Sequence, residues 1–187
     1  GFSGGGITCT NTGLNVRTGL LVSDCNIYMC GAGVNVAYFS EFHRWTNVTG
    51  KYCYYGCICN GGNNNFANCD FSGNKIGLLM DNSTGQSRNP AHGSFVGCSF
   101  HHSNNVYEGS EIVSVGTAIR ILNMVPGEIF SGCQIGFGGI EIDDCTGVRF
   151  DGCNLLRMTP ITVTDSTVVV FSDCTFYNAS ASPVTQS

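Results

Sequence analysis

Hydrophobic and polar residues along the chain follow a repeat of about 21 residues. The clear copies share the motif Phe-x-(Gly/Asn/Asp)-Cys-x-apolar and lie at 66–71, 95–100, 130–135, 150–155 and 171–176. Weaker copies lie at 21–27, with one extra residue, and at 45–48. An apolar-x-apolar triplet precedes them, at positions 14/16, 34/36, 57/59, 78/80, 119/121, 140/142 and 161/163. A fixed period of this length is typical of a stacked repeat architecture.

Each regular repeat predicts three short strands. In the repeat 139–155 the apolar pairs are Ile140/Ile142, Val148/Phe150 and Cys153/Leu155. Both members of an i, i+2 pair point to the same side of a strand. Two residues separate the second strand from the third, and the second of these is Asp24, Asn47, Asn68, Gly97, Gly132, Gly152 or Asp173. These residue types tolerate positive φ, so we expect a left-handed bend in every repeat.

The pattern predicts an all-β fold, a single-stranded right-handed parallel β-helix of about seven coils with three short strands per coil. We expect the β-helix at 13–178, a lead-in at 1–12 that joins a further domain, and a tail at 179–187. A leucine-rich repeat has a similar period, but its helical segments and Leu-rich spacing are missing. The predicted interior stack is Leu21, Trp45, Phe66, Phe95, Phe130, Phe150 and Phe171.

One side of the predicted coil breaks the apolar pattern. The first position of the second strand is not apolar in five coils, where it is Gly19, His43, Asn64, Gly93 and Glu128. We therefore expect this side to be irregular in the early coils.

Composition excludes several other classes of protein. Only 11% of residues are charged, against about 25% in an average domain. Helix-forming residues are scarce, and 11% aromatic content argues against disorder. The net charge of -5 arises in 128–187, and the chain has no basic stripe, so nucleic acid is not an expected partner. No apolar run reaches the ~20 residues that membrane insertion needs.

The cysteines are expected to be core residues. Six of the twelve, at 25, 69, 98, 133, 153 and 174, share one position of the repeat. We expect a ladder of free thiols there, and hence folding in a reducing compartment. Cys53, Cys57, Cys59 and Cys69 could instead form a four-thiolate zinc site, but Cys57 and Cys59 occupy an apolar triplet. We expect no metal and no cofactor.

The coils between Ala118 and Phe176 resemble the right-handed parallel β-helix of pectate lyases and, more closely, of bacteriophage tailspikes. In that architecture a two-residue bend separates the second and third sheets, and loops beside the first sheet bind the substrate. The resemblance does not extend to the catalytic cluster of polygalacturonases. Asp143-Asp144 occurs, but Gly-His-Gly and Arg-x-Lys do not.

The predicted site is a groove on the outer face of the first strands. Long insertions at 81–92 and 101–118 border this face in adjacent coils. The outward residues that form its floor are Asn15, Asn35, Ile58, Leu79, Arg120, Glu141 and Thr162. The candidates for substrate binding are Arg88, His92, His101, His102, Tyr107 and Arg120. Because Trp45 falls in the core register, Tyr107, Tyr52, Tyr54 or Tyr55 would have to stack on a sugar.

Three carboxylates are candidates for catalysis. Glycosidases use two carboxylates ~5–9 Å apart, and Glu108, Glu111 and Glu141 are available. The alternative for Glu141 is a plain ion pair with Arg120 in the neighbouring coil. His101 and His102 are a further candidate pair for a metal ion, but adjacent side chains on an extended chain point apart, so we expect them to be solvated loop residues instead.

The resemblance implies a phage tailspike or tail-fibre domain that recognises a bacterial surface polysaccharide, as a homotrimer and together with other domains of a longer spike. It would be assembled in the host cytoplasm and located in the virion tail. The alternatives are a polysaccharide depolymerase, either glycosidase or lyase, on the same scaffold, and a non-catalytic shaft or adhesin.

Overall fold

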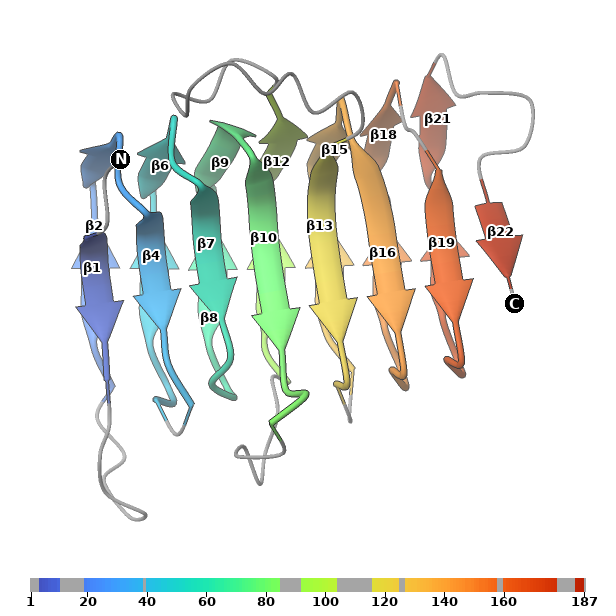
Figure 1. Ribbon diagram of the computed structural model, residues 1–187, viewed down its shortest axis with the longest axis horizontal. Helices are drawn as coiled ribbons and strands as arrows, with labels where there is room; N and C mark the ends of the chain where they lie inside the picture. The colour runs from blue at the N-terminus through green and yellow to red at the C-terminus, as the bar shows by residue number, and fades with distance from the viewer. Residues whose placement is uncertain are drawn as a thin grey trace.

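The computed structural model describes residues 4–10, 19–38, 40–84, 92–103, 116–124, 127–157, 160–177 and 184–186. These residues form β-strands and contain no helix, so the described part of the chain has no helical membrane span. The strands coil into a parallel β-helix with three strands per coil (Figure 1). The fold class predicted from the 21-residue period is therefore confirmed.

Three parallel sheets form the walls of the β-helix. Sheet A consists of β1 (Gly5–Cys9), β4 (Ala32–Val36), β7 (Tyr55–Cys59), β10 (Ile76–Asp81), β13 (Thr117–Leu122), β16 (Gly139–Asp143), β19 (Ile161–Thr164) and β22 (Val184–Gln186). Sheet B consists of β2 (Leu21–Ser23), β5 (Arg44–Thr46), β8 (Asn65–Ala67), β11 (Ser94–Val96), β14 (Ile129–Ser131), β17 (Arg149–Asp151) and β20 (Val170–Ser172). Sheet C consists of β3 (Asn26–Tyr28), β6 (Thr49–Lys51), β9 (Asp70–Asn74), β12 (Ser99–His102), β15 (Gln134–Gly136), β18 (Asn154–Leu156) and β21 (Thr175–Tyr177).

Sheet A extends beyond the expected limits of the β-helix at both ends. Strand β1 lies in the segment expected to be a lead-in and pairs with β4. Strand β22 lies in the expected tail and pairs with β19. The apolar triplet at 14/16, expected to be the first strand, lies outside the described residues.

A stack of aromatic rings runs through the interior beside sheet B. The successive ring centroids of Trp45, Phe66, Phe95, Phe130, Phe150 and Phe171 lie 4.6 to 5.6 Å apart, with interplanar angles of 4° to 11°. The predicted first member was wrong. Val22 pairs with Trp45, whereas Leu21 is 72% exposed on the outside. The motif in the first coil therefore begins at Val22 and contains no extra residue.

Cysteine thiols line the bend between sheets B and C. Each thiol in the later coils donates to the backbone carbonyl of the aromatic residue one coil earlier. Cys133 bonds to Phe95 O at 3.3 Å, and Cys153 bonds to Phe130 O at 3.5 Å. All twelve cysteines of the chain are free thiols. Their repeat position reflects a small side chain that fits the core and offers a weak donor.

The bend itself has the predicted left-handed backbone. The second bend residue has φ between 53° and 63° in every coil, and these residues are Asp24, Asn47, Asn68, Gly97, Gly132, Gly152 and Asp173.

The side expected to be irregular is regular. Sheet B runs through all its coils, and the polar residues that precede its strands turn inward. Asn64 Oδ1 accepts from the His43 backbone N–H at 3.0 Å, and Glu128 Oε2 accepts from the Gly93 N–H at 3.0 Å. Leu20, not Gly19, takes this position in the first coil, and its N–H donates to His43 Nδ1 at 3.1 Å. Polar side chains are tolerated here because they satisfy backbone groups of the preceding coil.

Candidate functional site

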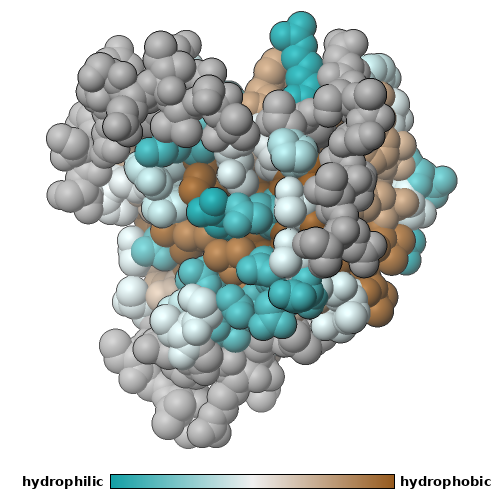
Figure 2. All heavy atoms as spheres, turned by 45° about the vertical axis from the view of Figure 1, so that its right-hand side comes forward, coloured by the Kyte–Doolittle hydropathy of each residue, from teal (hydrophilic) through white to brown (hydrophobic). Residues whose placement is uncertain are grey.

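The outer face of sheet A carries a cavity of about 330 Å³ near the C-terminal end of the β-helix. It is lined by Gly116, Thr117, Gly139, Ile140, Glu141, Asp143, Pro160, Thr162 and Thr164. The volume lies within the usual range for small-molecule sites. In Figure 2, which turns the C-terminal end forward, hydrophilic residues spread over the middle of the described surface with hydrophobic residues between them.

Strand alternation places the polar side chains of the cavity. In β19, Ile161 and Val163 are buried in the core, so Thr162 and Thr164 face outward. The in-register neighbours of these two threonines in β16 are Glu141 and Asp143. Two hydroxyls and two carboxylates therefore form a square patch on a rigid sheet.

Glycine shapes the upstream end of the cavity. A Cβ on Gly116 would lie 1.8 Å from the His102 ring, and a Cβ on Gly138 would lie 2.7 Å from His102 Cβ. His102 is only 8% exposed, and its Nδ1 lies 2.9 Å from the Lys75 carbonyl oxygen. His102 therefore supports the corner between sheets C and A from inside, and glycine beside it keeps the surface open.

An ion pair borders the cavity. Arg120 Nε donates to Glu141 Oε2 at 2.7 Å, from in-register positions of β13 and β16. The two side chains are 37% and 39% exposed. The pairing considered as the alternative to catalysis by Glu141 is thus present. It occupies one carboxylate oxygen and fixes the orientation of both groups.

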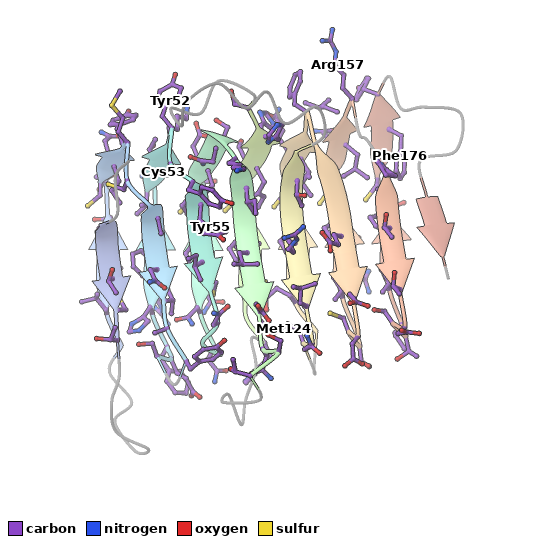
Figure 3. The ribbon with its side chains drawn as sticks, in the orientation of Figure 1. Tyr52, Cys53, Tyr55, Met124, Arg157 and Phe176 are labelled. Carbon is purple, nitrogen blue, oxygen red and sulfur yellow. The ribbon has the colours of Figure 1, made fainter. Side chains whose placement is uncertain are left out.

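An aromatic side chain lies on the same sheet. Tyr55 begins β7, and Figure 3 shows its ring over the outer side of sheet A. Burial raises the pKa of the Tyr55 hydroxyl and nearby Tyr54 adds to this, whereas Arg120 and Lys75 oppose it. At neutral pH the hydroxyl is therefore a neutral donor and acceptor. Sheet A thus presents a ring, an ion pair and a polar cavity in sequence along the axis.

The structure brings together only part of the predicted site. Arg120 and Glu141 lie on sheet A as expected, and Thr162 lies in the cavity beside them. His92 lies half-buried just before β11. The remaining candidates, Arg88, Tyr107, Glu108 and Glu111, lie outside the described residues.

The interpretation of His101 and His102 as solvated loop residues was wrong. Both belong to β12 of sheet C. The expectation that the two side chains diverge is confirmed. His101 lies on the outer face of sheet C with its ring 5.4 Å from Phe137, whereas His102 is buried at the corner.

Sequence reasoning missed Thr117, Asp143 and Thr164 as cavity residues. For Asp143 and Thr164 the signal was available, because strand alternation puts the residue two positions after each predicted floor residue on the same face. Thr117 has no such signal, because the register shifts between it and Ile119. Asp143 and Thr164 stand two positions after Glu141 and Thr162. The prediction followed only one outward row and therefore described a line instead of a surface.

The four cysteines considered for a zinc site are buried core residues. Cys57 and Cys59 face the core, and burial raises the pKa of both thiols well above the usual value. In the described part of the chain, no three His, Cys, Asp or Glu side chains gather as metal ligands would.

Comparison with known proteins identifies no relative of this chain. No protein family, curated protein or solved structure matches the chain.

Proposed function

We propose that this protein is a β-helix domain of the tailspike kind, which binds a bacterial surface polysaccharide on the outer face of sheet A. The observation that carries the proposal is the cavity lined by Glu141, Asp143, Thr162 and Thr164. The lining is rich in hydrogen-bonding groups. Its central strand, β16, pairs with β13 on one side and β19 on the other, which keeps the lining rigid. A ligand rich in hydroxyl groups matches such a lining, because it can donate to carboxylates and exchange hydrogen bonds with threonine.

The charge of the site supports a neutral or amino-substituted glycan as ligand. Asp143 and Glu141 lie in the cavity, and the Arg120 guanidinium that borders it already bonds to Glu141. The excess of acidic over basic residues arises in 128–187. A polysaccharide rich in uronic acids would be repelled from this end of the molecule.

Binding explains the geometry better than catalysis does. Glu141 and Asp143 stand two residues apart on one parallel strand and face the same side, so their Cα atoms lie about 7 Å apart at a rise of ~3.3 Å per residue. This separation suits an inverting glycosidase, which places its carboxyls ~6.5–9.5 Å apart. However, Arg120 bonds to Glu141 and holds it in place. Recognition is therefore the first candidate, and depolymerase activity is the second.

The proposal includes the assembly implied by the resemblance. A homotrimer, further domains of a longer spike and a location in the virion tail are parts of it. Light scattering tests the trimer, because a particle of the chain's own 19.8 kDa would contradict it.

The replacement of cavity residues is expected to weaken polysaccharide binding. The variants are Asp143→Asn and the double variant Thr162→Val with Thr164→Val, titrated calorimetrically with purified O-antigen and capsular polysaccharides. Asp143→Asn changes one hydrogen-bonding group and the double variant removes two, and each group is worth about 1 kcal/mol. We therefore expect the affinity for the polysaccharide to fall roughly fivefold to thirtyfold.

Matched controls lie on sheet B. Asp151→Asn and Thr46→Val change the same residue types at outward positions of β17 and β5 and are expected to bind like the wild type. Equal losses in cavity and control variants would contradict the proposal. Release of reducing ends by the wild type, abolished in Asp143→Asn or Glu141→Gln, would establish the depolymerase instead.

A further inference from the structure

A column of hydrogen-bonding side chains, uncharged at six of its seven positions, runs along the outer face of sheet C. The strands pair in register, so one outward residue of each coil stands directly beside the next. Six of these residues are Asn26, Thr49, Ser99, Gln134, Asn154 and Thr175. The seventh, Asp70, forms an ion pair with Lys51. The corresponding column of sheet B is interrupted by Leu21, Ile129 and Val170.

Exposed aromatic rings follow one edge of this column. Tyr28, Tyr52, Phe137 and Tyr177 lie at the ends of sheet C strands or just beyond them and are 46% to 52% exposed. Figure 3 shows Tyr52 projecting outward at this corner of the coils, where Arg157 also projects. Polar groups and rings thus run side by side along the axis of the β-helix.

The backbone under these rings is unfavourable for bulky side chains. Tyr52 has φ of 56° and Phe137 has φ of 57°, in the left-handed region. Such conformations are genuine outliers for large residues and strain the backbone. The fold does not require bulk at this position, because the equivalent residue one coil after Tyr52 is Gly73, with φ of 74°. The backbone at this position therefore gives no reason for an aromatic residue.

The rings are held in place by their neighbours. The Tyr52 ring stacks on Tyr28, with centroids 6.3 Å apart at 28°, and Gly73 puts no side chain against it. The Phe137 ring contacts the edge of His101 at 5.4 Å, and the Arg157 guanidinium lies 5.7 Å from its centroid. Immobilised, half-exposed rings lose little entropy when a ligand stacks on them.

We propose that the outer face of sheet C is a second saccharide-binding surface, which takes a neutral oligosaccharide chain lying along the β-helix axis. The rings of Tyr52 and Phe137 stack on the apolar faces of sugar rings, and the polar column bonds to their hydroxyl groups. The two rings lie three coils apart, ~14 Å at the usual spacing between strands, which an extended oligosaccharide bridges. The inference extends the proposed polysaccharide function to a different sheet and does not use the cavity on sheet A.

The test uses neutral hexasaccharides as probes. Cellohexaose, maltohexaose and mannohexaose are titrated against the wild type, Tyr52→Ala and Phe137→Ala by NMR. At least one hexasaccharide is expected to bind the wild type, and each alanine variant is expected to weaken it about tenfold, as the loss of one stacking ring does. Tyr52→Phe and Phe137→Tyr keep the aromatic ring and are expected to bind the hexasaccharide like the wild type.

A matched aromatic control lies on a different corner. Phe42 is 40% exposed and has φ of 65°, so Phe42→Ala removes an equally exposed ring on an equally unfavourable backbone. It is expected to leave hexasaccharide binding unchanged. The proposal is overturned if no hexasaccharide binds, if Phe42→Ala weakens binding as much as Tyr52→Ala, or if only the cavity variants of sheet A weaken it. None of these results would contradict polysaccharide binding in the cavity of sheet A. The proposals for sheet A and sheet C can therefore fail separately.

Discussion

Phe130→Ala is expected to lower the free energy of unfolding by about 3–5 kcal/mol, the range for truncating a buried phenylalanine. Phe130 is fully buried, and its ring stacks between Phe95 at 5.1 Å and Phe150 at 4.7 Å. Removal of the ring leaves a gap in the middle of the column, where paired strands above and below prevent collapse. Urea unfolding followed by circular dichroism measures the loss.

Phe176→Ala is the control for this prediction. Phe176 lies in the last coil and is 40% exposed, because no further strand of sheet C covers β21 among the described residues. Its truncation is expected to cost about 1 kcal/mol or less, as at most exposed positions. If Phe130→Ala cost no more than Phe176→Ala, the aromatic stack would not be the core of the fold.

Glu128 is expected to make stability fall as the pH rises from about 4.5 to about 8, and the fall dominates above about pH 6.5, where buried histidine no longer opposes it. This carboxyl group is 1% exposed, and burial raises its pKa from 4.5 to about 8. Because the folded state then binds a proton that the unfolded state has released, stability decreases with rising pH between the two pKa values. The slope approaches about 1.4 kcal/mol per pH unit. Above the pKa that Glu128 has in the folded state, the interior must hold the charged Glu128 carboxylate beside the Cys57 and Cys59 thiols.

Buried His43 opposes the effect of Glu128 at the acidic end of this pH range. Burial lowers the pKa of His43, so its contribution to stability is lost as the pH falls below about 6.5, with the opposite slope. Urea midpoints measured from pH 5 to pH 9 are therefore expected to decline mainly on the alkaline side. Glu128→Gln keeps the acceptor for the Gly93 N–H and is expected to abolish that decline. An unchanged decline in Glu128→Gln would show that another group causes it, whereas Glu141→Gln, at a half-exposed site, should leave it intact.

The sequence predicts the architecture well where one residue type repeats at one position. The column from Phe66 to Phe171 and the Gly, Asn or Asp bends determine the register of the coils almost alone. The first coil was misaligned because Val22 replaces the aromatic residue, and adjacent Leu21 has the same apolar character. Composition cannot distinguish two neighbouring aliphatic residues, whereas hydrogen-bond register can.

Polar interior positions were harder to predict. His43, Asn64 and Glu128 suggested an irregular side because their hydrogen-bond partners belong to the preceding coil and are not visible in a single repeat. The candidate site was found in part for a similar reason. Alternation indicated Glu141 and Thr162, but the cavity also depends on Gly116. The ring of His102, which belongs to sheet C, leaves no room for a side chain at Gly116. Such through-space relations follow from packing and not from the local pattern.

Methyl NMR of the threonine residues tests polysaccharide binding on sheet A most directly. Thr117, Thr162 and Thr164 line the cavity, whereas Thr46 lies on sheet B and serves as the internal reference. When the bacterial polysaccharide that binds best is added, the three cavity methyl resonances are expected to shift or broaden and that of Thr46 to stay. A bound polysaccharide that left all three cavity resonances unchanged would contradict the proposed site.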